Sequence, residues 1–280
     1  MILVTGATGR VGSELVAQLI ERGEHVRVFS RDAQRVAHLG DRVKVAVGDL
    51  GQPETLVDAM RGVSHLFLVT LDFGTGQDEN AVTAARQAGV RHVVKLSTFG
   101  AGDPTLKIDT SMHARDEVIR ASGLDWTFVR PGQFASNALQ WAGEIKAQGT
   151  VHHPGGEGRA APIDPYDIAA VAAVALTQSG HAGQAYQLTG PDLLTVREQV
   201  ETIARALGRP IEYTDIPVAA VSDRMRQAGL PAGMVDALAK LMASMQDGRG
   251  AERTDIVAQV MGRAPRTFEQ WCQAHVAAFH

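Results

Sequence analysis

The sequence contains little cysteine, few tyrosines and no long apolar run, and each shortage excludes a kind of protein. A single cysteine, Cys272, cannot form an intramolecular disulfide or a C-x-x-C metal site, which favours a reducing cytoplasm. No stretch approaches the roughly 18 unbroken apolar residues of a membrane span, and the first residues lack the basic and apolar regions of a signal peptide. We therefore expect a cytoplasmic protein with no membrane partner.

Positive charge is also in short supply. Lysine and arginine total 27 against 31 acidic residues, so the net charge of −4 provides no global field to bind nucleic acid directly. Apolar residues make up 45% and charged residues 21% of the 280 positions, which is the balance of an ordinary globular protein. A chain of this length buries a core without disulfides or metals.

The strongest motif lies in the first dozen residues. Ile2–Thr5 reads as a short buried strand, and Gly6, Gly9 and Gly12 carry the chain through a turn into a helix. Glycine permits close backbone approach, and the free N–H groups of a helix N-terminus attract phosphate. The G-x-x-G-x-x-G spacing varies from the better-known G-x-G-x-x-G fingerprint and needs support from its surroundings. We predict that this turn binds a dinucleotide through Gly6, Ala7, Thr8, Gly9, Arg10 and Val11.

The end of the second predicted strand, His25–Ser30, indicates which nucleotide is bound. An acidic residue there would accept the ribose hydroxyls of NAD, but this chain has Arg31. The flat donor fork of arginine matches a 2′-phosphate, and Arg10 could approach the same group, so we predict NADP(H). The alternative is that Arg31 starts a polar loop and Arg10 is solvated.

A third strand, Val43–Val47, is followed by Asp49 and Leu50. The carboxylate could accept from the adenine amino group while the leucine packs on the ring. Asp49 could equally cap the next helix.

Strands and helices continue to alternate along the chain. Further strands are predicted over His65–Thr70, Val90–Ser97 and Asp125–Val129, each separated from the next by a helical pattern. This predicts an α/β protein with a Rossmann-type doubly wound parallel sheet over residues 1–190 and a smaller, mainly helical C-terminal lobe over 191–280. Ligands of such folds lie beyond the carboxyl ends of the strands. Five residues fall at these ends: Gly6, Arg31, Asp49, Thr70 and Ser97.

Two segments nearer the C-terminus have patterns of their own. Residues 149–158, with His152 and His153, look like a loop; adjacent side chains point apart in an extended chain, so we predict no metal there. Residues 267–279 read as one helix.

With the glycine turn, Asp49-Leu50, Ser97-Thr98 and the stretch from Ser122 to Phe134 in view, the sequence resembles the atypical short-chain dehydrogenases. More narrowly, it resembles their NmrA-like group, which includes NAD(P)H:quinone oxidoreductases, triphenylmethane reductase and redox-sensing regulators. The resemblance implies a Rossmann domain with the cofactor over the glycine turn and Arg31. It also implies that the nicotinamide lies near Thr70, Ser97, Pro131, Gln133 and Phe134.

One departure from the wider superfamily concerns its acid–base tyrosine, which usually lies on the helix after the fifth strand. The three tyrosines of this chain, Tyr166, Tyr186 and Tyr213, all lie far beyond that helix. The helix holds His113 and Glu117, one turn apart, and the NmrA-like group often has such a pair. His113 is our candidate proton donor; alternatively it is a structural residue bonded to Glu117.

These observations favour an NADPH-dependent reductase that delivers hydride to a quinone or similar conjugated acceptor. Reduction of a quinone creates a phenolate-like oxygen, which needs less proton assistance than an alkoxide. Phe73, Asn137 and Trp141 are candidates to face an aromatic or quinonoid substrate. The alternative is a non-catalytic NADP(H)-sensing regulatory protein, and a homodimer is possible because related folds often dimerise. The tyrosine count disfavours a sugar epimerase.

Overall fold

The computed structural model describes residues 1–70, 74–102, 110–248 and 251–280, so Phe73 lies outside the described residues. The contacts divide the chain into two compact units. The first contains Met1–Pro131, Pro165–Leu188 and Gln259–Gly262, and the second contains Gly132–Asp164, Thr189–Ala258 and Arg263–His280. The units interleave along the chain, and the functional division into residues 1–190 and 191–280 stays a prediction.

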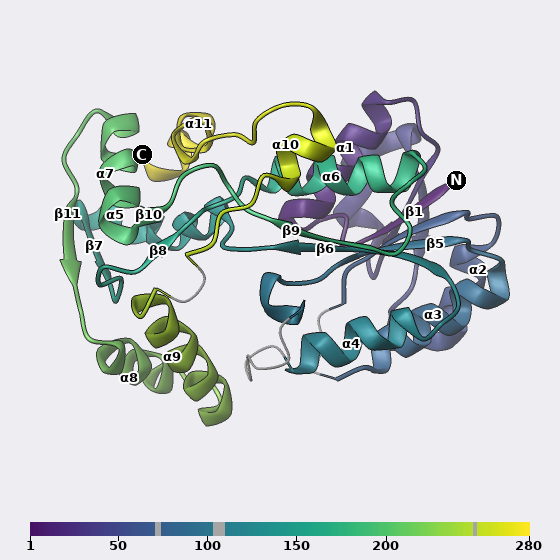
Figure 1. Ribbon diagram of the computed structural model, residues 1–280, viewed down its shortest axis with the longest axis horizontal. Coiled ribbons are helices and arrows are strands. Elements are labelled where there is room, and N and C mark those ends of the chain that lie inside the picture. Colours follow the sequence, from purple (N-terminus) through teal and green to yellow (C-terminus); the bar gives the residue numbers. More distant parts are fainter. Residues whose placement is uncertain (71–73, 103–109, 249–250) are drawn as a thin grey trace. The chain divides into compact units, whose positions relative to one another are not determined.

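A seven-stranded parallel sheet forms the centre of the first unit (Figure 1), with the strand order β3-β2-β1-β4-β5-β6-β9. The strands are β1 (Ile2–Thr5), β2 (Val26–Ser30), β3 (Lys44–Val47), β4 (His65–Leu68), β5 (His92–Leu96), β6 (Asp125–Pro131) and β9 (Gln184–Leu188). The order changes direction between β1 and β4, and ligands of doubly wound sheets bind at such a switch point. The predicted Rossmann-type fold is confirmed.

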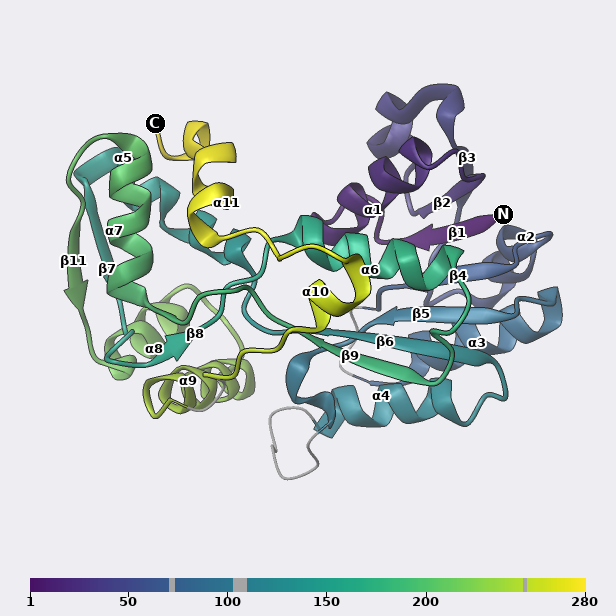
Figure 2. The ribbon, with the colours of Figure 1, turned by 45° about the horizontal axis from the view of Figure 1, so that its top comes forward.

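Helices cover both faces of this sheet (Figure 2). The helices α2 (Leu56–Met60), α3 (Gly76–Ala88) and α4 (Thr110–Arg120) lie on one face, and α1 (Arg10–Glu21) packs beside α6 (Pro165–Thr177) on the other. Apolar side chains of β1, β4, β5 and β6, among them Leu3, Leu66, Val93 and Phe128, form a core with α2, α3 and α4. Because β4 and β5 are covered on both faces, their residues are almost continuously buried.

Short 3-10 turns connect several of these elements: η1 (Ala33–Arg42), η2 (Pro53–Thr55) and η3 (Phe99–Gly102). Over the parts of the chain that the structure describes, none of the helices combines the length and the apolar character needed to cross a membrane.

The second unit is mainly helical. It contains η5 (Ala135–Trp141), α5 (Ala142–Gln148), β7 (Thr150–His153), β8 (Arg159–Ala160), β10 (Leu194–Thr195), α7 (Val196–Leu207), β11 (Glu212–Asp215), α8 (Val218–Gln227), α9 (Ala232–Gln246), α11 (Phe268–Ala274) and η6 (Val276–Phe279). The helix α10 (Ile256–Met261) begins in this unit. The core of the second unit contains side chains of η5, α5, α7 and α11.

Two predictions for this part of the chain are wrong. Residues 149–158 are not entirely a loop, because Thr150–His153 forms β7 and pairs in parallel with β11. The partner strand is far away in the sequence, so the local glycine and proline signals dominated the prediction. Residues 267–279 do not form one helix, since α11 ends at Ala274 and a separate 3-10 turn, η6, follows.

Candidate cofactor site at the strand ends

The glycine turn between β1 and α1 has the geometry of a phosphate-binding turn. Gly6 has a φ of +65°, which residues with a side chain rarely adopt, and it begins the turn directly after β1. A Cβ atom on Gly12 would lie 2.1 Å from the carbonyl oxygen of Gly6, so only glycine lets α1 pack this closely on the turn. These two glycines bring the backbone into position for a ligand.

The N-terminus of α1 is open toward solvent. Gly9 is its N-cap and has no side-chain cap, while Thr8, Gly9 and Arg10 are exposed. The neighbouring residues Ala7 and Val11 are buried and hold the turn against the protein interior. The first N–H groups of this 12-residue helix and its dipole fit a pyrophosphate, so the predicted cradle is compatible with a dinucleotide.

The turn after β2 places Arg31 on the surface beside an acidic residue that the sequence reasoning had overlooked. The carboxylate of Asp32 accepts a hydrogen bond from the backbone N–H of Gln34 at 2.8 Å and thereby caps η1. The hydroxyl of Ser30 donates to the carbonyl oxygen of Asp32 at 2.7 Å. The acid therefore organises the turn, and binding of a 2′-phosphate by the exposed Arg31 stays a prediction.

Asp49 lies in the turn after β3. Its Oδ1 atom accepts from the backbone N–H of Gly51 at 2.8 Å, so the side chain caps a turn rather than the first residue of a helix. Leu50 is half-buried against the core, and its carbonyl oxygen accepts from Asn80 of α3 at 2.9 Å. Adenine binding by Asp49 and Leu50 stays a prediction.

The residue Thr70, just beyond β4, belongs to a buried ionic cluster. Its hydroxyl donates to the carboxylate of Asp78 in α3 and accepts from the Lys95 ammonium at 3.1 Å and from the guanidinium of Arg115. Asp78 also forms ion pairs with both Lys95 and Arg115. Asp78 and Lys95 are each 0% exposed.

The next strand repeats this arrangement. The hydroxyl of Ser97, just beyond β5, donates to Oδ2 of Asp116 in α4 at 2.9 Å. The same oxygen accepts from Arg130 of β6 at 2.8 Å and 3.2 Å. Each strand-end hydroxyl is thus held by a carboxylate of the following helix, and a cation of the next strand neutralises that carboxylate. Lys95 and Ser97 are two residues apart and therefore point to the same face of the sheet.

Burial disfavours the charged forms of the ionisable side chains in this cluster. Desolvation lowers the pKa of Lys95, helped by the nearby Arg115, while the carboxylate of Asp78 acts in the opposite direction. Desolvation raises the pKa of Asp116 against the hydrogen bonds from Arg130 and Ser97. This cluster was not predicted from the sequence, although a lysine among the apolar residues of a strand indicates a buried partner.

His113 lies in α4 but does not pair with Glu117. Its Nδ1 atom is 3.0 Å from the carbonyl oxygen of Ala101, while the carboxylate of Glu117 forms an ion pair with Arg120. The alternative role predicted for the histidine, a structural bond to Glu117, is therefore wrong, because a nearby cation takes that carboxylate. Since a carbonyl only accepts, Nδ1 carries the proton and Nε2 is the atom that can exchange one.

The remaining predicted residues follow β6. Pro131 is the last, buried residue of that strand. Gln133 and Phe134 belong to the second unit, where the backbone of Ile163 bonds to Gln133 and bridges Phe134. Asn137 is half-buried in η5.

Trp141 packs in the core of the second unit and is 4% exposed. Its placement favours packing over an open aromatic wall, and substrate contact by Asn137 or Trp141 stays a prediction.

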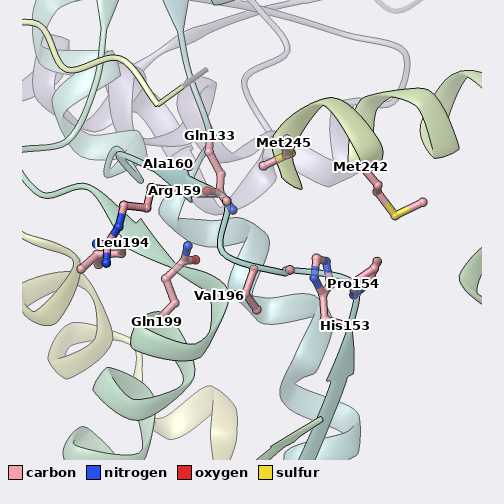
Figure 3. A pocket seen from close by; sticks show the side chains of 12 residues that line it. Gln133, His153, Pro154, Arg159, Ala160, Leu194, Val196, Gln199, Met242 and Met245 are labelled. Carbon is pink, nitrogen blue, oxygen red and sulfur yellow. The ribbon is translucent and has the colours of Figure 1, made fainter. Parts of the chain in front are cut away.

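A small cavity of about 30 Å³ lies within the second unit (Figure 3). Its lining includes Met242 and Met245 of α9 together with Gln133 and His153. Within the described chain, Oε1 of Gln133 and Nδ1 of His153 are buried without hydrogen-bond partners. Burial lowers the pKa of His153, so its ring is held in the neutral form. The volume is enough for about two water molecules and too small for a whole aromatic ring.

The fold and the strand-end site define a Rossmann-type nucleotide-binding protein. Residues 6–179 match the family described as NAD(P)H-binding, and the chain belongs to that family. Its architecture is that of the NmrA-like atypical short-chain dehydrogenases, as the sequence resemblance predicted.

Two relatives span the whole chain. The (4-alkanoyl-5-oxo-2,5-dihydrofuran-3-yl)methyl phosphate reductase of Streptomyces griseus is 39% identical and covers 100% of this chain and 99% of its own. The NAD(P)H azoreductase of Xenophilus azovorans is also 39% identical, with the same coverage. Among solved structures, the Escherichia coli NADPH-dependent quinone oxidoreductase complexed with NADPH is similar in fold, with a TM-score of 0.86, 24% identity and coverage of 98% and 99%.

Proposed function

We propose that this protein is an NADPH-dependent reductase that transfers hydride to a quinone or a similar conjugated small molecule. The observation that carries the proposal is the open phosphate cradle at the switch point of the sheet, combined with a helix α4 that lacks the acid–base tyrosine. The names of both 39%-identical relatives support it, since each describes reduction of a conjugated system, an alkanoyl dihydrofuranone or an azo compound.

The cofactor would lie along the carboxyl ends of the strands. The N–H groups of the glycine turn would hold the pyrophosphate, and Arg31 with Arg10 would bind the 2′-phosphate. Asp49 and Leu50 would bind adenine. When bound, NADPH supplies the hydride.

The acceptor's own chemistry explains how the reaction proceeds without a tyrosine. Hydride addition to a quinone leaves a phenolate-like oxygen whose pKa is roughly 10, so weak proton assistance suffices. With Nδ1 of His113 donating to the carbonyl of Ala101, only a protonated ring can donate from Nε2. His113 or water would therefore supply the proton.

An acceptor panel tests the proposal. Purified protein with NADPH would be assayed against quinones, azo dyes and enones by the loss of NADPH absorbance, with NADH as the matched cofactor control. We expect turnover of at least one conjugated acceptor and a preference for NADPH. If none is reduced above background while NADPH binds, the reductase proposal fails, and comparing the affinities for NADPH and NADP⁺ tests the alternative of a non-catalytic NADP(H) sensor.

We propose an aromatic or quinonoid small molecule as the substrate, no direct contact with nucleic acid, a homodimer in solution and a cytoplasmic location. The buried thiol of Cys272, whose pKa burial raises to about 12, fits a reducing compartment because it has no disulfide partner.

A further inference from the structure

The hydroxyls of Thr70 and Ser97 occupy equivalent places but differ in the hydrogen bonds that they have left. A hydroxyl has one donor and two acceptor positions. Thr70 uses all three, because it donates to Asp78 and accepts from both Lys95 and Arg115. Its side chain is therefore saturated and has no capacity to bind a further ligand.

Ser97 uses only its proton. The hydroxyl donates to Oδ2 of Asp116, and no described residue donates to its oxygen, so two acceptor positions are left. The backbone N–H of Ser97 donates to the carbonyl oxygen of Val129 at 2.8 Å, which holds the residue against β6. Ser97 is 6% exposed and thus holds a fixed hydrogen-bond acceptor just beyond the carboxyl end of β5.

This orientation does not depend on the ionisation of Asp116. Oδ2 accepts from Arg130 and from Ser97, whereas Oδ1 is buried with no hydrogen-bond partner among the described residues. A proton on the carboxyl group would therefore reside on Oδ1, and Ser97 would still donate to Oδ2. Because its only proton is committed, Ser97 cannot replace the missing tyrosine as a proton donor.

We infer that Ser97 accepts an N–H group from the nicotinamide end of the cofactor, with Asp116 and Arg130 as positioning residues, and that Thr70 contributes no side-chain bond there. The carboxamide is the N–H donor of that end. The inference rests on the proposed binding of NADP(H) at the carboxyl ends of the strands. It also separates two residues that the sequence had given the same role.

Paired ligands test the inference by equilibrium binding. Calorimetry would compare NADP⁺ with its 3-acetylpyridine analogue, in which a methyl ketone replaces the carboxamide and no N–H remains. In Ser97→Ala we expect NADP⁺ to bind about two- to tenfold more weakly and the analogue to bind unchanged. In the matched control Thr70→Val, the affinity ratio of the two ligands stays that of the wild type, while the melting temperature falls because buried donors lose their acceptor.

Asp116→Ala tests the positioning role, because it removes the oxygen that accepts the Ser97 proton. We expect it to reduce the preference for NADP⁺ over the analogue, and adding Ser97→Ala should produce no further reduction. A merely structural residue would weaken both ligands equally. If this variant does not fold, Ser97→Ala alone decides the inference.

Three outcomes overturn the inference: equal loss of both ligands in Ser97→Ala, no loss of either, or a changed ratio in Thr70→Val. Failure of the reductase proposal would give a different set of results from failure of this inference. A chain that shows the expected ratios but reduces no acceptor removes the proposed reaction and supports the role of Ser97.

Discussion

Asp78 is expected to contribute more to stability than either cation it binds. Its carboxylate is 0% exposed and pairs with Lys95, with Nε of Arg115 at 2.9 Å, and with the hydroxyl of Thr70 at 3.1 Å. Substitution by asparagine would leave two cations facing each other in a medium of low polarity. Asp78→Asn therefore breaks both its ion pair with Lys95 and its ion pair with Arg115.

The expected magnitudes follow from the remaining contacts. Removing one partner of a buried ion pair costs about 3–5 kcal/mol because the other charge is left uncompensated. Lys95→Met should cost less than about 2 kcal/mol, since Asp78 keeps Arg115 and Thr70 and the methionine fills a similar volume. Desolvation already lowers the pKa of Lys95, which further reduces what its charge contributes.

Urea unfolding followed by circular dichroism measures both free energies, and thermal melting checks them. At about 2–4 °C per kcal/mol, Asp78→Asn should lower the melting temperature by roughly 6–20 °C. Asp58→Asn is the matched control, because Asp58 also pairs with an arginine, Arg61, but is 79% exposed. We expect the control to change stability by no more than about 1 kcal/mol. A loss in Lys95→Met equal to or larger than that in Asp78→Asn would refute the reasoning.

Further predictions concern the cofactor, the proton and the fold. Arg31→Ala should weaken NADPH about tenfold or more and leave NADH nearly unchanged, as measured by nucleotide fluorescence; equal loss for both removes the 2′-phosphate assignment. His113→Ala should lower reductase turnover by at most about a hundredfold; unchanged turnover at every pH would show a structural histidine. Burial lowers the pKa of His92 from 6.5 to about 4, so the unfolded chain binds the additional proton between these values. The free energy of unfolding should therefore fall by about 2–3 kcal/mol as the pH drops through this window. If the urea midpoints of His92→Gln decrease with falling pH as steeply as those of the wild type, this prediction is wrong. Gly12→Ala should cost about 1–3 kcal/mol in urea unfolding and weaken NADPH, because its Cβ would lie 2.1 Å from the carbonyl oxygen of Gly6; wild-type stability and affinity would contradict it.

Local patterns in the sequence were enough to predict most strands and helices of the first unit. Its apolar strands and glycine-bearing turns alternate with helices, and each of these signals depends on neighbours within about one turn or strand. The prediction failed at β7, whose partner strand β11 lies some sixty positions further along the chain. Local composition there indicated a loop, because strand pairing between distant segments leaves no signature in either segment alone.

The residues of the candidate site likewise fall into those that local sequence could predict and those that depend on distant partners. The glycine turn and Arg31 were identifiable because backbone geometry and charge at a strand end depend on the residue present there. Thr70 and Ser97 were placed correctly at strand ends, but their different hydrogen-bonding capacities depend on Asp78 and Asp116, which come from helices. Those partners could not be paired from spacing alone.

The sequence by itself thus determined an α/β chain with a phosphate-binding turn, a cation suited to a 2′-phosphate and no tyrosine to act as acid. Only the tertiary structure decided which buried carboxylate holds which hydroxyl, and that His113 bonds to Ala101 rather than to Glu117. The physical reason is that buried charges are stabilised by partners from other elements, and the fold alone brings those elements together.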